Sequence, residues 1–275
     1  MGTHKLAGFT VIEVVLFLAI SSALIVGLIS ATGLSLNNQR YKDAADTFKS
    51  TLQQQYADLM SVQNAREDNW YCGAGAQPDE DAGTQQDRGQ SDCMLMGKYL
   101  RIENGDISIY SVIGYGSEPF SASSDIAALR NNYLLNVSNA EVSESRLEWG
   151  TQIAWPKNVA SNTPGVVGPP NTVPTTPRKL GILIVRSPGS GQIYTFTHSG
   201  TAVPAKNDIR TTTLSNMLVA GNTTPGQGSQ LICIESNGLF INSDRAVYLN
   251  SFASASSAVE LRSNDFMKQS GGPQC

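Results

Sequence analysis

One uninterrupted apolar run near the start of the chain limits what the chain can fold into. From Val11 to Ile29 the residues are apolar apart from Glu13, two serines and one glycine, and no proline interrupts them. As a helix rising about 1.5 Å per residue, this run is about 30 Å long, the thickness of the hydrocarbon core of a bilayer. The run therefore predicts a membrane-spanning helix. The flanking positive charges do not decide its orientation.

The helical pattern continues beyond the apolar run. Six residues recur at steps of three and four, which places them on one face of an amphipathic helix. They are Tyr41, Ala45, Phe48, Leu52, Tyr56 and Leu59. One helix over residues 9–64 is therefore predicted, with a membrane part to about residue 36 and an amphipathic part beyond it. Any bend is expected at Gly27, Ser30, Thr32 or Gly33.

Two features of this segment have alternative explanations. The stretch "LISATG", from Leu28 to Gly33, also matches a signal-peptidase cleavage site, so ordinary secretion is an alternative to a retained helix. A carboxylate such as that of Glu13 costs about 2.5–3.5 kcal/mol at the bilayer centre and less near the interface. Glu13 therefore either reaches the headgroups from the helix end or meets a cation inside the lipid or an assembly.

The stretch "AGFTVIEVVLFLAI" resembles the processing site of type IV pilins and type II secretion pseudopilins. In that family a short basic leader ends in glycine, and a prepilin peptidase cuts before a phenylalanine and methylates the new amine. The resemblance covers about the first thirty residues. It implies a leader over residues 1–8, cleavage after Gly8, a methylated N-terminus at Phe9, and Glu13 as the glutamate at mature position five. Major pilins often carry a proline in the apolar run, which this chain lacks.

The resemblance also implies a function. The Glu13 carboxylate would pair with the Phe9 amine of a neighbouring subunit in a helical filament, because an unpaired charge in lipid is strongly disfavoured. Before assembly the chain would be a single-pass membrane protein with its head outside the cytoplasm, and afterwards part of a cell-surface pilus. The family serves adhesion, twitching motility, DNA uptake and protein export. The long, loop-rich head favours a minor pilin. A membrane-anchored or secreted binding module that forms no filament is the alternative.

The four cysteines are Cys72, Cys93, Cys233 and Cys275. They form no CxxC pair, and the chain has only two histidines, so a zinc site of the usual spacing is not expected. An even number of cysteines after a membrane signal suggests two disulfides in an oxidising compartment. Of the three possible pairings we favour Cys72 with Cys93 and Cys233 with Cys275, because each closes a local loop. Free buried thiols are the alternative. In pilins a disulfide such as the one expected between Cys233 and Cys275 commonly closes a C-terminal loop.

Residues 65–275 are predicted to form a β-rich head, which makes the fold class α+β. Asn104-Gly105 lies inside the alternating stretch from Met96 to Gly114 and is a strong hairpin signal. Further strands are expected at residues 133–137, 145–154, 180–185 and 192–198 and at "LICIES", "GLFINS" and "AVYLNS". Together they predict one antiparallel sheet of five to eight strands, against which the long helix packs, as in the pilin fold.

Two segments of the head are predicted to be loops, residues 73–92 and 156–178. The second contains six of the twelve prolines. The first carries five carboxylates against one arginine, whereas the rest of the chain has 18 acidic and 18 basic residues. Its residues Asp79, Asp81, Asp87 and Asp92 are weak calcium candidates, because Ca²⁺ takes carboxylate ligands. Their spacing fits no known calcium loop, so a solvated surface loop is the favoured explanation.

Sequence motifs give no sign of catalysis. The chain has no GxSxG, no HExxH, no phosphate loop and no clustered histidines, and His198 is expected to be an ordinary surface residue. We therefore expect no enzymatic activity and no cofactor. The lack of a basic cluster on the head also argues against nucleic-acid binding by this chain.

Overall fold

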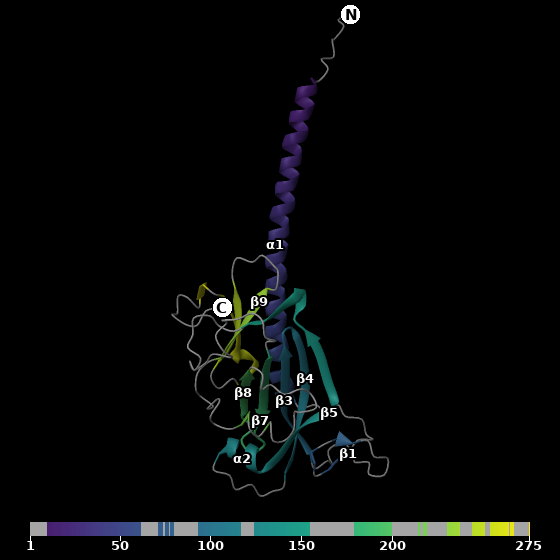
Figure 1. Cartoon of the computed structure of the whole chain (residues 1–275). Coiled ribbons are helices and arrows are strands. Elements are labelled where there is room, and N and C mark those ends of the chain that lie inside the picture. Colours follow the sequence, from purple (N-terminus) through teal and green to yellow (C-terminus); the bar gives the residue numbers. More distant parts are fainter. Residues whose placement is uncertain are drawn as a thin grey trace, which may run out of the picture.

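The computed structural model describes residues 10–61, 71–73, 75–76, 78–79, 93–116, 124–154, 179–199, 214, 217–218, 230–236, 244–250, 254–263, 265–266 and 275. In this part of the chain one long helix, α1 (Val11–Met60), packs by its C-terminal half against antiparallel sheets, and its N-terminal half extends away from the head (Figure 1). The α+β fold class predicted from the sequence is therefore confirmed.

Helix α1 is continuous between two defined ends. It begins after Thr10, the N-cap, and ends at Met60, where the Ser61 N–H donates to the Ala57 carbonyl at 2.9 Å. The helix passes through the predicted weak points without a break. There the hydroxyls of Ser30 and Thr32 donate to carbonyls one turn earlier, at 2.9 Å each, so they bond within the helix. The predicted residues 61–64 are not helical at Ser61, and those beyond it lie outside the described residues.

The larger sheet has the strand order β5-β4-β3-β7-β8. Its strands are β3 (Cys93–Glu103), β4 (Asp106–Gly116), β5 (Tyr133–Arg146), β7 (Lys179–Arg186) and β8 (Ile193–Ser199). The hairpin predicted at Asn104-Gly105 joins β3 to β4, and Asn104 has a φ of 56°, the left-handed conformation that asparagine tolerates in a tight turn. The second predicted hairpin is β7–β8.

The smaller sheet has the order β11-β10-β9-β6. Its strands are β6 (Thr151–Ala154), β9 (Gln230–Ser236), β10 (Arg245–Leu249) and β11 (Val259–Ser263), and β1 (Tyr71–Cys72) pairs separately with β2 (Pro78–Asp79). The prediction of one sheet is therefore wrong. The strand predicted over residues 145–154 is divided by a 3-10 turn, η1 (Glu148–Gly150), at which the chain passes from one sheet to the other. The stretch "GLFINS" lies outside the described residues.

The sequence analysis missed the short helix α2 (Asp125–Asn131) and strand β11. It also missed the two-residue strands β1 and β2, and β2 lies inside the segment 73–92 that was predicted to be a loop. The loop predicted over residues 156–178 lies outside the described residues. In the structure α2 packs near the outer face of the larger sheet, where Asp125 accepts a hydrogen bond from Tyr194 of β8 at 2.9 Å. One or two turns of helix give too short a periodic pattern to be recognised. Strand β11 does carry a readable signal, because Val259, Glu260, Leu261 and Arg262 alternate between apolar and polar residues.

The main core lies where α1 packs against the inner faces of both sheets. All six residues of the predicted helix face are buried there, with isoleucines, leucines and valines from β3, β4, β7, β9 and β10. Two tyrosines on this face tie the helix to the sheets. The Tyr41 hydroxyl donates to the Ile234 carbonyl and accepts from the Arg245 N–H, each at 2.7 Å, and the Tyr56 hydroxyl lies 2.7 Å from Thr195 Oγ1.

Truncation of the core face of α1 should destabilise the head. Leu52 is fully buried between the helix and the sheets. The variant Leu52→Ala is expected to lower the free energy of unfolding by about 2–5 kcal/mol, because it removes buried methyl groups and leaves a cavity. Urea unfolding of the full chain in detergent measures this. The matched control is Leu36→Ala on the exposed half of α1, expected to change stability by less than about 0.5 kcal/mol. Equal effects of both variants would contradict this packing.

The buried tyrosines predict a loss of stability at alkaline pH. Burial raises the pKa of Tyr41 and of Tyr56 to about 12, against hydrogen bonds that lower it. Between pH about 10 and about 12 the folded state therefore keeps these two protons, whereas the unfolded chain, whose tyrosine pKa is near 10, has lost them. The contribution of these two tyrosines to the free energy of unfolding is complete below pH about 10 and is lost as the pH rises toward 12.

Urea unfolding at a series of pH values measures this slope. Tyr56→Phe removes one of the tyrosines with a raised pKa, together with its hydrogen bond to Thr195. The variant should therefore be less stable by about 0.5–1.5 kcal/mol at pH 8 and have a smaller alkaline slope. An unchanged slope would show that Tyr56 does not titrate in this way.

Candidate functional site

The N-terminal half of α1 is an apolar surface that the head does not cover. Residues 11–36 extend beyond the sheets (Figure 1), and nearly all of their side chains are exposed. An 18-residue window of this helix has a mean hydropathy of 2.6, and none of it is buried. Its length and composition suit a single membrane crossing, a test that a signal sequence near the N-terminus would also pass. The predicted membrane segment is thus placed where lipid or another protein can reach it.

Glu13 lies in the first turn of this helix, in a capping box with Thr10. Glu13 Oε2 accepts hydrogen bonds from the Thr10 backbone N–H and from Thr10 Oγ1, both at 3.0 Å, and the Glu13 N–H donates to Thr10 Oγ1 at 3.4 Å. This pattern satisfies backbone donors that have no partner inside the helix, and it places a negative charge at the positive end of the helix dipole. The carboxylate is exposed.

The capping role of Thr10 was missed in the sequence analysis. The signal for it was readable, because threonine, two further residues and glutamate directly before an apolar run form the capping-box pattern "TVIE". The processing residues Gly8 and Phe9 lie outside the described residues. The structure therefore places Glu13 at the start of the exposed helix, two residues after its first residue, Val11.

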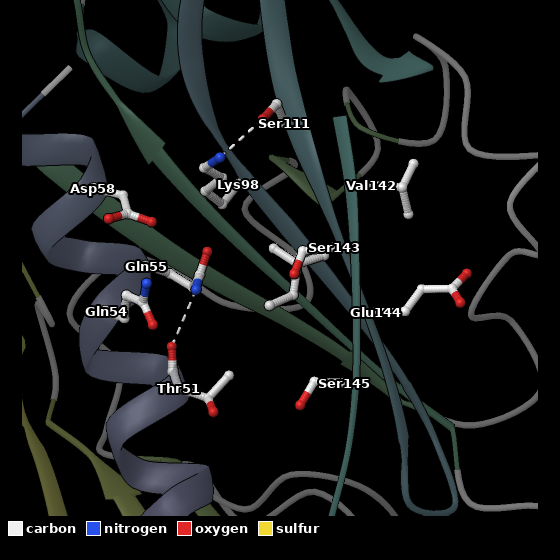
Figure 2. A pocket seen from close by; sticks show the side chains of 11 residues that line it. Thr51, Gln54, Gln55, Asp58, Lys98, Ser111, Val142, Ser143, Glu144 and Ser145 are labelled. Atoms are coloured by element: carbon white, nitrogen blue, oxygen red, sulfur yellow. Dashed lines mark hydrogen bonds between the residues drawn. The ribbon is translucent and has the colours of Figure 1, made fainter. Parts of the chain in front are cut away.

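The head carries a polar groove beside α1. It has a volume of about 510 Å³ and lies between the C-terminal half of α1 and the β3–β4–β5 side of the larger sheet (Figure 2). The groove is lined by Thr51, Gln54, Gln55, Asp58, Lys98, Ile109, Ser111, Val142, Ser143, Glu144 and Ser145. It exists because α1 covers the apolar middle of the sheet and leaves the polar corner near β5 uncovered.

Three of the polar side chains that line this groove, Lys98, Ser111 and Gln55, make hydrogen bonds within the head. Lys98 Nζ donates to Ser111 Oγ at 2.9 Å, and Gln55 Nε2 donates to the Thr51 carbonyl at 3.2 Å (Figure 2). Gln55 and Ser111 are only 5% and 3% exposed. The lining carries hydroxyl, amide, ammonium and carboxylate groups. The groove therefore offers hydrogen bonds to a polar ligand.

The calcium candidates cannot be joined into a site from the described residues. Asp79 lies in β2, and Asp81, Asp87 and Asp92 lie outside the described residues. Within the part of the chain that the structure describes, no group of three or more histidine, cysteine, aspartate or glutamate side chains could hold a metal ion. His198 lies in β8, where it pairs with Gly181 of β7.

All four cysteines are in disulfides, in the two pairings favoured from the sequence. Cys72 of β1 is joined to Cys93 at the start of β3, with their Cα atoms 5.9 Å apart, and Cys233 of β9 is joined to Cys275, with Cα atoms 5.5 Å apart. The second disulfide is buried and packs with Ala154, Leu231 and Ala246 on the outer face of the smaller sheet. It therefore fixes the C-terminal residue against the head.

Removal of the disulfides should destabilise the head unequally. The double variant Cys233→Ala/Cys275→Ala opens a loop with a sequence separation of 42 residues, and Cys72→Ala/Cys93→Ala opens one of 21. Loop-closure entropy predicts losses of about 4 and about 3 kcal/mol respectively. The first variant also loses buried sulfur contacts. Urea unfolding of the full chain measures both losses, and a smaller loss for the Cys233–Cys275 variant would contradict this order.

No family model, curated protein or solved structure matches the chain. The long apolar helix packed on antiparallel sheets is nevertheless compatible with a pilin-like architecture. In the described part of the chain, what the structure supports directly is one helix long and apolar enough to anchor the chain in a membrane, joined to a disulfide-bonded β-rich head.

Proposed function

We propose that this chain is a structural subunit of a type IV pilus-like filament. In this proposal the prepilin peptidase cleaves after Gly8 and methylates Phe9, and the mature chain is anchored by α1 until it joins the filament. The observation that carries the proposal is Glu13, a carboxylate in the first turn of an uncovered apolar helix. The junction of Gly8 and Phe9 precedes it at the spacing typical of pilins.

The uncovered half of α1 needs a partner, because its exposed apolar side chains are strongly disfavoured in water. Lipid can cover it in a monomer, and the same half-helices of other subunits can cover it in a filament. A contact between the amine of one subunit and the carboxylate of the next runs in one direction only. Such a heterologous contact repeats as an open helix, which is the symmetry of a filament.

The capping box is compatible with this contact. Both hydrogen bonds from Thr10 reach Glu13 Oε2. An ionised carboxylate has about four acceptor positions on its two oxygens, so Oε1 can accept the amine of a neighbour while Oε2 still caps the helix. In a low dielectric this pair acts mainly as a register device, since desolvation offsets much of its attraction.

The head favours a minor pilin over the major subunit. Over residues 65–275 it combines two main sheets, the short β1–β2 pair, two disulfides and the predicted loops at residues 73–92 and 156–178. The proposed partners are other pilin subunits, the prepilin peptidase and the membrane. The proposed location is the membrane before assembly, with the head outside the cytoplasm, and the cell-surface pilus afterwards.

Substitution of Glu13 tests the proposal. Glu13→Ala should still be cleaved and methylated but should enter filaments far less, because the neighbour's amine loses its partner. Glu13→Gln keeps an acceptor without the charge and should behave similarly. The matched control Thr10→Ala removes the capping hydroxyl and keeps the carboxylate, so it should enter filaments better than either variant. Mass spectrometry of the N-terminus and immunoblots of sheared filaments against membranes give the two readouts.

Normal incorporation of Glu13→Ala would refute the charge-pair mechanism.

The polar groove supports a second candidate function, an anchored or secreted binding module that forms no filament. The mature N-terminus separates these functions. A methylated Phe9 supports the filament, an intact Met1 supports a plain membrane anchor, and a start near Thr32 supports ordinary secretion.

A further inference from the structure

Trp149 has an unusual conformation at the surface of the head. It lies in η1 with φ 57° and ψ 26°, and its side chain is 50% exposed. The left-handed region is unfavourable for a bulky side chain, and glycine or asparagine would adopt it far more readily. The following residue, Gly150, also has a positive φ, of 71°. The corner between the two sheets thus needs left-handed residues, but one of them is an exposed tryptophan.

The residues on both sides of Trp149 hold this conformation in place. Leu147 is buried, and its N–H donates to the Gly105 carbonyl at 2.7 Å. Thr151 is also buried, and its Oγ1 donates to the Glu148 carbonyl at 2.9 Å. Strained residues persist when their surroundings determine them in this way, and they cluster at functional sites. The turn therefore presents the indole ring in a fixed direction.

The ring lies where α1 leaves the head. The guanidinium carbon of Arg40 is 4.7 Å from the centre of the Trp149 ring, in cation–π geometry. Long side chains on a helix lean toward its N-terminus, so the ring lies beside the turn that precedes Arg40. In that turn the apolar run ends at Leu36, which is 52% exposed, and polar residues follow.

The expected depth of the membrane coincides with this turn. If Glu13 lies at one face of the hydrocarbon core, about 30 Å of helix reaches Gly33 at the other face. The headgroup layer extends about 5–7 Å further, which corresponds to the next four or five residues. Arg40 lies seven residues beyond Gly33, about 10 Å along the helix. Because its side chain leans back toward the helix N-terminus, its guanidinium and the Trp149 ring reach the outer edge of the headgroup layer.

We propose that Trp149 and Arg40 form an interfacial anchor that binds the phospholipid headgroup layer while α1 spans the membrane. The indole has an apolar ring and one polar N–H, a combination enriched at this depth. Arg40 supplies a cation for lipid phosphate. The anchor fixes the height and rotation of the head above the membrane before assembly. It rests on the membrane-anchoring part of the proposed function and is independent of the Glu13 contact.

Fluorescence of Trp149 in vesicles tests this anchor. The full chain with Trp70→Phe and Trp155→Phe keeps Trp149 as its only tryptophan. It is reconstituted into phosphatidylcholine vesicles whose acyl chains carry bromine either near the headgroup or near the methyl end. We expect emission to lose more intensity with the shallow bromines than with the deep ones, and iodide in the water to quench it less than in the urea-unfolded chain. The loss should persist when protein is diluted in lipid.

Three outcomes would overturn the anchor. Protein that floats with the vesicles and shows no bromine quenching would refute it and leave the filament proposal intact. Shielding from iodide only at high protein density would assign Trp149 to contacts between neighbouring heads. Protein that fails to float would refute both this anchor and the membrane stage of the proposed function. Loss of filament incorporation in the Glu13 variants has no bearing on the quenching.

A matched variant separates anchoring from packing. Trp149→Asn suits the left-handed conformation, so in detergent it should unfold at a temperature equal to or above that of the parent protein. In vesicles the head should then be held less firmly, seen as faster hydrogen exchange of the amides in η1 than in the parent. A lower unfolding temperature together with unchanged exchange would show that Trp149 only packs the corner between the sheets.

Discussion

Packing of one face of α1 against the inner faces of both sheets is the contact on which the rest of the head depends. Tyr41 bonds to β9 and β10 of the smaller sheet, and Tyr56 bonds to β8 of the larger one. Without the helix, neither sheet would have a cover for its apolar inner face. The uncovered apolar half belongs to the same continuous helix. Packing in the core of the head therefore also sets the orientation of the head relative to that half.

The passage of the chain from one sheet to the other at η1 affects two surfaces of the head. At the end where α1 emerges, it requires a tight corner and places Trp149 beside Arg40. Along the side, β5 remains an edge of the larger sheet, and α1 leaves the polar corner near it open as the groove that contains Lys98 and Gln55. Both surfaces therefore follow from the way two sheets share one helix.

Glu13 has a local structural role in addition to the role in assembly that we propose for it. Its contacts with Thr10 explain why the helix begins where it does, and they need no other molecule. A glutamate at this third position of a capping box would suit any soluble helix. In the proposed filament the same charge would lie where lipid or another subunit covers the helix, and that environment, more than the cap, would make a partner amine valuable.

The sequence by itself determined the long helix, its buried face from Tyr41 to Leu59 and the hairpin at Asn104-Gly105, because periodicity and turn chemistry are local properties. The division into two sheets, the left-handed Trp149, the polar groove and the outer covering by α2 were decided only by tertiary structure. Each depends on which strands meet and what α1 leaves uncovered, and these contacts join residues up to about two hundred positions apart, such as Tyr41 and Arg245. No local pattern records such pairings.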